Sequence, residues 1–322
     1  QGYGVGSHED RSHRDDHTVH DLAAGYAPDL ASDQHARTSE HPRERRPYGR
    51  VRDYFCAIEE AIQFVLLNKM RYLCIGPGGT GIFTIAGFLK RHESSLDDVE
   101  EIAGSSAGAI IGLFLSLGYS MDHIVDLLLS ADMQKFVKVD VKSFFTNFGF
   151  VDTTPIREEF VRLCDCDPTF AQLDKKFYVS AFCLNTGETV YFSRDTHPDM
   201  KVIDAVLMSM SVPLIFSTSR FEGYTYTDGG TIEAFPVTPF LGKKPHEVLC
   251  IKLKSTKKYQ EDIRNHIQFL EALLRSTLNN RRADTVENMR VVELDVGELN
   301  VFDFSIDLET KGKLYTKGYD HC

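Results

Sequence analysis

Two stretches of the chain share one order of features: a short apolar run, a break at glycine residues, and an apolar pattern with helical spacing. Residues 71–75 form the first run, residues 76–81 the glycine-rich break, and residues 82–90 the helical pattern. Residues 99–103 form the second run, and residues 104–117 supply its break and an apolar helix. Buried strands that alternate with helices are typical of a largely parallel sheet. We therefore predict an α/β fold of three layers, in which helices flank a central, mostly parallel sheet.

The rest of the chain adds elements of the same kinds and one polar arm. Strands are expected at residues 177–184, 188–192, 224–227 and 247–253, and helices at residues 54–70, 202–210 and 262–278. Residues 1–48 are polar and show neither helical nor strand periodicity. This predicts a disordered arm ahead of one folded domain at residues 49–322. The arm carries His8, His13, His17 and His20, whose irregular spacing favours a solvated segment over a metal site.

Composition and charge narrow the classes of function. The formal net charge of −11 argues against nucleic-acid binding, which needs clustered Lys and Arg. No apolar run reaches the roughly 20 residues of a membrane span. The seven cysteines lie mostly in apolar stretches, as buried thiols do in a reducing compartment. Cys164 and Cys166 lack zinc-site spacing, so we expect no metal. We also expect no cofactor and, from the buried thiols, an intracellular, cytoplasmic protein.

The second glycine break has the pattern Gly104-x-Ser106-x-Gly108 between an apolar run and an apolar helix. This is the signature of a nucleophile elbow, in which small neighbours permit the strained turn that presents a serine. The helix that follows would place the positive end of its dipole near a developing oxyanion. A serine at a helix start is also a common N-cap, so the pattern alone leaves both interpretations open.

The first glycine break also permits two interpretations. Backbone N–H groups of residues 77–81 can converge on an oxyanion. Gly76, Gly78 and Gly81 equally fit the G-x-G-x-x-G fingerprint of dinucleotide-binding proteins. That fingerprint requires an acidic residue at the end of the next strand, where this chain has Gly104.

A third motif follows at residues 224–230, where an alternating strand leads into Asp228-Gly229-Gly230. In this order, the glycine loop, the serine elbow and the Asp-Gly-Gly turn resemble the patatin-like phospholipase family. Residues 208–216 and 235–237 are also similar to the family's sequence around the aspartate. The resemblance implies a lipid acyl hydrolase in which Ser106 is the nucleophile and Asp228 the base, without a histidine. It also assigns a set of motif glycines: Gly76, Gly81, Gly104, Gly108, Gly229 and Gly230.

The resemblance further implies backbone oxyanion donors in the first glycine loop. Where the family has three glycines and then a basic residue, this chain has Pro77 at the second place and Thr80 at the basic one. Proline has no N–H, so the donors are expected at Gly78, Gly79 and Thr80.

The predicted function is hydrolysis of phospholipid or other lipid acyl esters through an acyl-serine. A catalytically silent lipid-binding module with the same fold stays open as an alternative, as does the dinucleotide-binding protein. The cluster Phe144, Phe145, Phe148 and Phe150 fits either core packing or an apolar surface that adsorbs transiently to lipid.

Overall fold

The computed structural model describes residues 70–233, 235–256 and 288–321, with a few isolated residues between 257 and 287. The helices predicted at residues 54–70 and 262–278 and the arm predicted at residues 1–48 lie almost wholly outside these residues, and they stay predictions.

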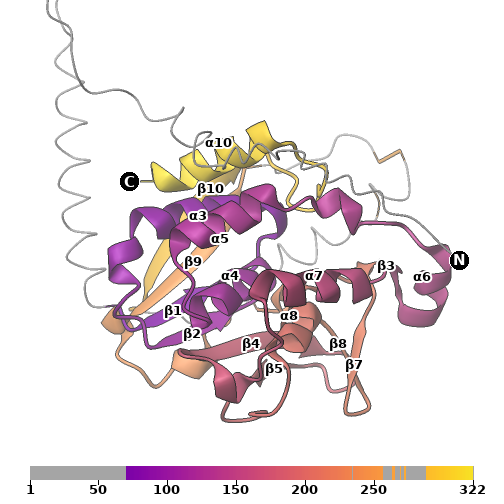
Figure 1. Ribbon diagram of the computed structural model, residues 1–322, viewed down its shortest axis with the longest axis horizontal. Coiled ribbons are helices and arrows are strands. Elements are labelled where there is room, and N and C mark those ends of the chain that lie inside the picture. Colours follow the sequence, from indigo (N-terminus) through magenta and orange to yellow (C-terminus); the bar gives the residue numbers. More distant parts are fainter. Residues whose placement is uncertain are drawn as a thin grey trace, which may run out of the picture. The chain divides into compact units, whose positions relative to one another are not determined.

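In the described residues, eight strands form one sheet in the order β10-β9-β1-β2-β4-β8-β7, and β5 pairs with β4 (Figure 1). All neighbours from β10 to β4 are parallel, whereas β5, β7 and β8 are antiparallel. The predicted central, mostly parallel sheet of an α/β fold is confirmed. The strands of this sheet are β1 (Tyr72–Ile75), β2 (Glu101–Gly104), β4 (Lys176–Cys183), β5 (Glu188–Phe192), β7 (Ser219–Phe221), β8 (Tyr224–Asp228), β9 (Val248–Ser255) and β10 (Arg290–Gly297).

Helices flank this sheet, and a small parallel pair of strands lies apart from it. The pair consists of β3 (Gly149–Val151) and β6 (Leu214–Phe216). The helices are α3 (Ile82–Arg91), α4 (Ala107–Ser116), α5 (Met121–Ser130), α6 (Val141–Asn147), α7 (Thr154–Cys164), α8 (Val202–Met210) and α10 (Leu308–Tyr319).

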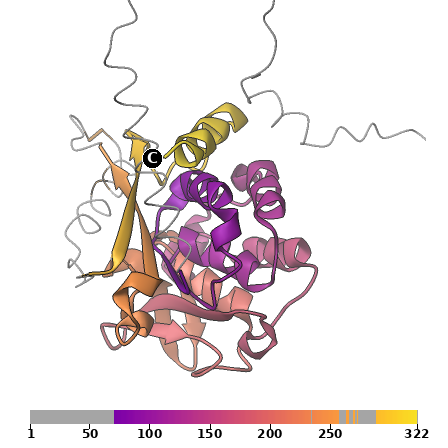
Figure 2. The ribbon, with the colours of Figure 1, turned by 90° about the vertical axis from the view of Figure 1, so that its left-hand side faces the viewer.

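The pleat of β1 divides the core between two faces of the sheet. Leu73 and Ile75 belong to the larger apolar cluster, which the helices cover. Tyr72 and Cys74 point to a smaller cluster formed with residues 235–240. Figure 2 shows α3, α4 and α5 gathered on the first of these faces.

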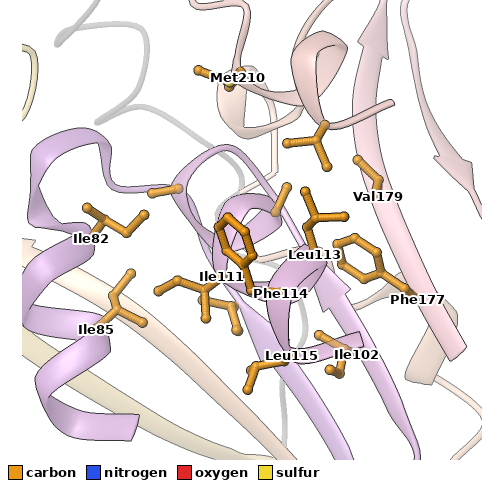
Figure 3. Packing of buried hydrophobic residues seen from close by; sticks show 14 of the residues in the cluster. Ile82, Ile85, Ile102, Ile111, Leu113, Phe114, Leu115, Phe177, Val179 and Met210 are labelled. Carbon is orange, nitrogen blue, oxygen red and sulfur yellow. The ribbon is translucent and has the colours of Figure 1, made fainter. Parts of the chain in front are cut away.

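Helix α4 is the centre of the larger cluster. Nine of its ten residues are buried, so it is apolar on every side. Figure 3 shows its side chains between Ile82 and Ile85 of α3 and Phe177 and Val179 of β4. Gly108 lets the helix approach β1, because a Cβ at this position would lie 2.2 Å from the Ile75 carbonyl oxygen. The beginning of α4 is therefore fixed against the end of β1.

The parallel strands β1 and β2 end at the same edge, where Ile75 is paired with Gly104. The Ser105 amide extends this pairing by donating to the Ile75 carbonyl at 3.1 Å. The glycine loop after β1 and the elbow after β2 consequently lie side by side. Crevices at the carboxyl ends of parallel strands are the usual ligand sites of such sheets.

Candidate active site

Ser106 stands in the turn between β2 and α4 with a strained backbone. Its φ of 52° and ψ of −118° are unusual for a residue that is not glycine. Such strain costs about 1–3 kcal/mol and persists only where the surroundings impose it. The Ser106 side chain makes no capping hydrogen bond to α4, so it does not act as the N-cap side chain that the sequence left open. It is 6% exposed.

The neighbours of Ser106 explain why the turn has this form. A Cβ at Gly104 would lie 2.6 Å from the Gly108 carbonyl oxygen, so the turn closes only with glycine there. Ser105 holds the turn through its backbone, because its carbonyl accepts from the Gly108 amide at 2.8 Å. Its hydroxyl is buried without a hydrogen-bond partner, so the Ser105 side chain is not a cap either.

A second serine, which the motifs had not singled out, holds the backbone of Ser106. The Ser106 amide donates to the Ser209 hydroxyl oxygen at 2.9 Å in a fully buried hydrogen bond. Ser209 lies in the last turn of α8, in the segment of residues 208–216 that carried part of the family resemblance. A serine within such an apolar helix is the signal that sequence reasoning could have used, since buried hydroxyls usually have a defined partner.

Asp228 ends β8 and is 5% exposed. One of its carboxylate oxygens accepts from the Gly230 amide at 2.7 Å, which orients the side chain within the Asp-Gly-Gly turn. Its own amide donates to the Ser211 carbonyl at 2.9 Å. The end of α8 therefore holds both motifs, through Ser209 on one side and Ser211 on the other.

The strand register relates the two motifs further. Strand β4 lies between β2 and β8, with Val179 paired to Gly104 and Ala181 paired to Asp228. Because β2 and β4 are parallel, the chain continues from Gly104 to Ser106 in the same direction in which β4 leads from Val179 to Ala181. The end of β2 and the end of β8 therefore reach the same level of β4.

The glycine loop touches both of the other motifs. A Cβ at Gly108 would lie 2.8 Å from the Gly76 carbonyl oxygen, and a Cβ at Gly230 would lie 2.6 Å from the Pro77 side chain. Pro77, a departure from the family pattern, thus packs against the turn that carries Asp228. The close approach of these segments requires glycine at both positions.

The loop also limits which amides are available as donors. The Thr80 amide donates to the Val301 carbonyl at 2.9 Å, so this N–H is already committed in the present conformation. Gly79 adopts a left-handed conformation with φ of 50°, and a Cβ there would lie 2.1 Å from the Val301 carbonyl oxygen. In the part of the chain that the structure describes, no acceptor is found for the amides of Gly78 and Gly79. The oxyanion role of the Gly78 and Gly79 amides stays a prediction.

The remaining motif glycines serve packing and hydrogen bonding. The Gly76 amide donates to the Ile251 carbonyl at 2.9 Å. Gly81 is the N-cap of α3, where a Cβ would collide with the Leu253 side chain. Gly229 lies over β4, where a Cβ would be 2.2 Å from the Ser180 carbonyl oxygen.

Several histidines of the described residues pack elsewhere in the fold. Within residues 70–233, 235–256 and 288–321, no hydrogen bond joins a histidine to Ser106. His92, His123 and His197 instead lie against aromatic rings. Among the described residues, no group of three His, Cys, Asp or Glu side chains is arranged to hold a metal ion.

Comparison with known proteins assigns the chain to a family. The sequence profile of the family described as patatin-like phospholipase matches residues 73–241, which include all three motifs. The chain belongs to the patatin-like phospholipase family. This membership argues against the dinucleotide-binding alternative and supports the lipid acyl hydrolase class.

The relatives of this patatin-like chain include viral proteins. It is 31% identical to the uncharacterized protein R571 of Acanthamoeba polyphaga mimivirus, over 54% of this chain and 62% of that protein. It is 26% identical to the probable lipid hydrolase 463L of Invertebrate iridescent virus 6, over 54% of this chain and 64% of that protein. The chain therefore spans less than two-thirds of the length of either relative.

A solved structure supports the same fold. The crystal structure of VipD from Legionella pneumophila matches 78% of this chain with a TM-score of 0.55, at 15% identity and over 66% of the VipD chain. At this identity, the similarity concerns the fold alone. In the described residues, no helix of the patatin-like chain is long and apolar enough to cross a membrane.

Proposed function

We propose that the chain hydrolyses acyl esters of lipids, phospholipids above all, through a dyad of Ser106 and Asp228. The observation that carries the proposal is the way the end of α8 holds both residues, with Ser209 on the Ser106 amide and Ser211 on the Asp228 amide. A serine with strained backbone and a side chain free of capping contacts is suited to nucleophilic attack. The family assignment and the probable lipid hydrolase among the relatives support a lipid substrate.

In the proposed cycle, the Ser106 Oγ attacks the ester carbonyl carbon while its proton passes to the Asp228 carboxylate. The amides of Gly78 and Gly79 and the amino-terminal end of α4 stabilise the oxyanion. When the C–O bond to the leaving alcohol breaks, Asp228 returns the proton to that alcohol, and an acyl-serine remains. Water then attacks the acyl-serine and gives up a proton to Asp228. When the bond between the acyl carbon and the Ser106 Oγ breaks, Asp228 returns this proton to the Oγ, and a free fatty acid leaves.

Burial is what allows a carboxylate to serve as the base. A solvated carboxylate binds a proton weakly, whereas exclusion of water favours the neutral acid. Asp228 is 5% exposed, and its Oδ1 accepts a hydrogen bond from the Gly230 amide. This environment supports direct proton transfer from Ser106 without an intervening imidazole.

The test combines labelling and turnover. The wild-type chain should react with a fluorophosphonate probe at Ser106 and release fatty acid from mixed phospholipid and glyceride vesicles, followed by mass spectrometry. Ser106→Ala and Asp228→Asn should each abolish fatty-acid release while the thermal unfolding transition persists. Loss of either group typically lowers such activity by a factor of 10³ or more, on the order seen for other catalytic serine hydrolase residues.

Ser105→Ala is the matched control, because Ser105 is an adjacent buried serine whose hydroxyl has no partner. It should retain both labelling and turnover. Turnover by Asp228→Asn at the wild-type rate would refute the dyad. A folded wild-type chain that binds vesicles but neither labels nor releases fatty acid would instead identify the catalytically silent lipid-binding module.

A further inference from the structure

Four large apolar side chains are exposed within ten residues around α6. They are Val139 at 69%, Val141 at 60%, Phe145 at 75% and Phe148 at 52% exposure, and together they are called the α6 patch here. Exposed apolar residues elsewhere in the described chain are separated along the sequence. Single exposed apolar residues are ordinary, whereas a group of them marks an interaction site.

A pair of stacked rings and a backbone hydrogen bond support the α6 patch. Phe144 and Phe150 stack with ring centroids 4.5 Å apart, and the Asp140 amide donates to the Phe150 carbonyl at 2.6 Å. Both rings are half-buried, whereas Phe145 and Phe148 are exposed. The cluster therefore divides between packing and surface, and Phe145 and Phe148 belong to the surface.

The backbone at the end of α6 turns Phe148 outward. Phe148 has a left-handed conformation with φ of 61°, which is rare for an aromatic residue. The next residue, Gly149, lies so close to β6 that a Cβ would be 2.0 Å from the Phe216 carbonyl oxygen. The Asn147 carbonyl accepts from the Thr218 amide at 2.9 Å. Contacts on both sides of Phe148 thus hold its backbone in this conformation, and the residue is 52% exposed.

Residues 132–152, which include the patch, carry three lysines and three aspartates, so their charges balance, whereas the whole chain carries −11. Lys135, Lys138 and Lys142 are exposed, and Lys135 pairs with Asp132 at 3.6 Å. The Asp140 carboxylate accepts from the Lys142 amide and caps α6. Among the described residues, Lys138 and Lys142 have no ion pair, whereas Asp140 and Asp152 accept hydrogen bonds from the Lys142 and Thr154 amides. Lysines without an ion pair beside exposed aromatic residues match the boundary of an anionic lipid bilayer, which is anionic outside and apolar inside. Lysine is depleted in protein–protein interfaces, which favours the lipid surface over a protein partner.

The α6 patch is joined to the proposed active site by one strand pair. Strand β3 follows α6 directly and pairs with β6, with Gly149 opposite Leu214 and Val151 opposite Phe216. Strand β6 begins shortly after Ser211, whose carbonyl holds the Asp228 amide. Figure 1 shows α6 next to β3 at the right-hand side of the view.

We propose that the α6 patch docks the protein on an anionic lipid bilayer, with Phe145 and Phe148 in the acyl boundary and Lys138 and Lys142 facing the headgroups. The purpose of docking, supply of lipid to Ser106, rests on the proposed function. The binding itself does not, and the two are separable by experiment.

Binding is measured by sedimentation of the full chain carrying Ser106→Ala with vesicles of phosphatidylcholine alone or with phosphatidylserine. The wild-type patch should bind the mixed vesicles more tightly, and added salt should weaken this binding. Phe145→Ala combined with Phe148→Gly should lower the partition coefficient by about tenfold or more, because each phenyl group loses its burial in lipid. Glycine at 148 also relieves the left-handed strain, so this variant should fold.

Leu184→Ala combined with Leu241→Ala is the control. These leucines are 51% and 59% exposed, respectively, and they lie outside the α6 patch. The control should bind as the parent does. Lys138→Glu combined with Lys142→Glu should remove the preference for phosphatidylserine. Unchanged binding by the two-phenylalanine variant would overturn the proposal, as would equal binding to neutral vesicles at every salt concentration. A patch that instead joins two copies, seen as a dimer that the same variant converts to monomer, would overturn it too.

The two proposals fail in different ways. Hydrolysis of a short-chain, water-soluble ester by the chain with Ser106 intact should be the same for the wild type and the two-phenylalanine variant. If this hydrolysis occurs and vesicle binding is absent, only the docking proposal fails. If vesicles bind and no ester is hydrolysed, only the proposed function fails.

Discussion

Replacing Ser209 by alanine removes one hydrogen bond from the backbone of the proposed nucleophile. The Ser209 hydroxyl accepts from the Ser106 amide at 2.9 Å, and Ser209 is fully buried, so no water can take its place without rearrangement. A buried donor left without an acceptor costs about 1–3 kcal/mol. Because the released amide belongs to a residue with φ of 52°, this cost falls on the conformation that presents the Ser106 side chain.

The consequence for turnover follows from that cost. If about 1–2 kcal/mol is lost from the elbow, kcat should fall by about 5- to 30-fold. KM should stay the same, because Ser209 touches the nucleophile's backbone rather than the substrate. The rate of fluorophosphonate labelling at Ser106 should fall in the same proportion as kcat.

Ser211→Ala is the control for this experiment. Ser211 lies in the same segment and is equally buried, and its hydroxyl donates to the Leu207 carbonyl at 2.6 Å. Both variants lose a buried hydrogen bond, and both should unfold at a lower temperature, by about 2–4 °C for each kcal/mol. Only Ser209→Ala should lower kcat and labelling. Equal kcat losses in the two variants, or a wild-type kcat for Ser209→Ala, would refute the positioning role.

Two further predictions concern stability. Gly108→Ala should destabilise the fold by several kcal/mol or prevent folding, because its Cβ would collide with the β1 backbone. Gly312→Ala, at a position on α10 with open space around it, should instead raise the free energy of unfolding by up to about 1 kcal/mol. Thermal unfolding of the two variants measures this difference. The Gly297 amide and then Lys317 hold the pKa of Asp295 below its usual range, so this stabilisation is present above about pH 4 and disappears as the pH falls through the lowered value. Denaturant unfolding between pH 2 and 6 should show a shallower acid loss for Asp295→Asn, and an unchanged slope would contradict this assignment.

Several elements were predictable from their apolar runs and from the turn residues at their ends. The predicted helix at residues 202–210 matches α8 in both bounds, and the predicted strand at residues 188–192 matches β5. Strands β1 and β2 were expected within two residues of their observed bounds, since apolar runs that end at glycine leave little ambiguity. The three motifs lie at the ends of such elements, which is why their proximity could be anticipated.

Helix α10 shows why other elements were not predicted. Its sequence is largely polar, and its buried residues are only Lys311, Leu314 and Gly318. It packs on α3 through backbone contact, because a Cβ at Gly318 would lie 1.9 Å from the Thr84 carbonyl oxygen and one at Gly87 would lie 2.0 Å from the Tyr315 carbonyl oxygen. Contacts made by paired glycines leave no apolar stripe, so periodicity analysis has nothing to detect.

The same limit applied to the site itself. From the sequence, Ser106 fits both a helix cap and a nucleophile, because the two roles share the residue type and the position at a helix start. They differ in what satisfies the local hydrogen bonds. A capping serine uses its own hydroxyl on the helix, whereas here the Ser106 hydroxyl makes no cap bond and its amide is satisfied by Ser209, 103 residues away. An elbow whose backbone is held from outside leaves its hydroxyl uncommitted, and this long-range bond, rather than the glycine pattern, favours the nucleophile over the cap.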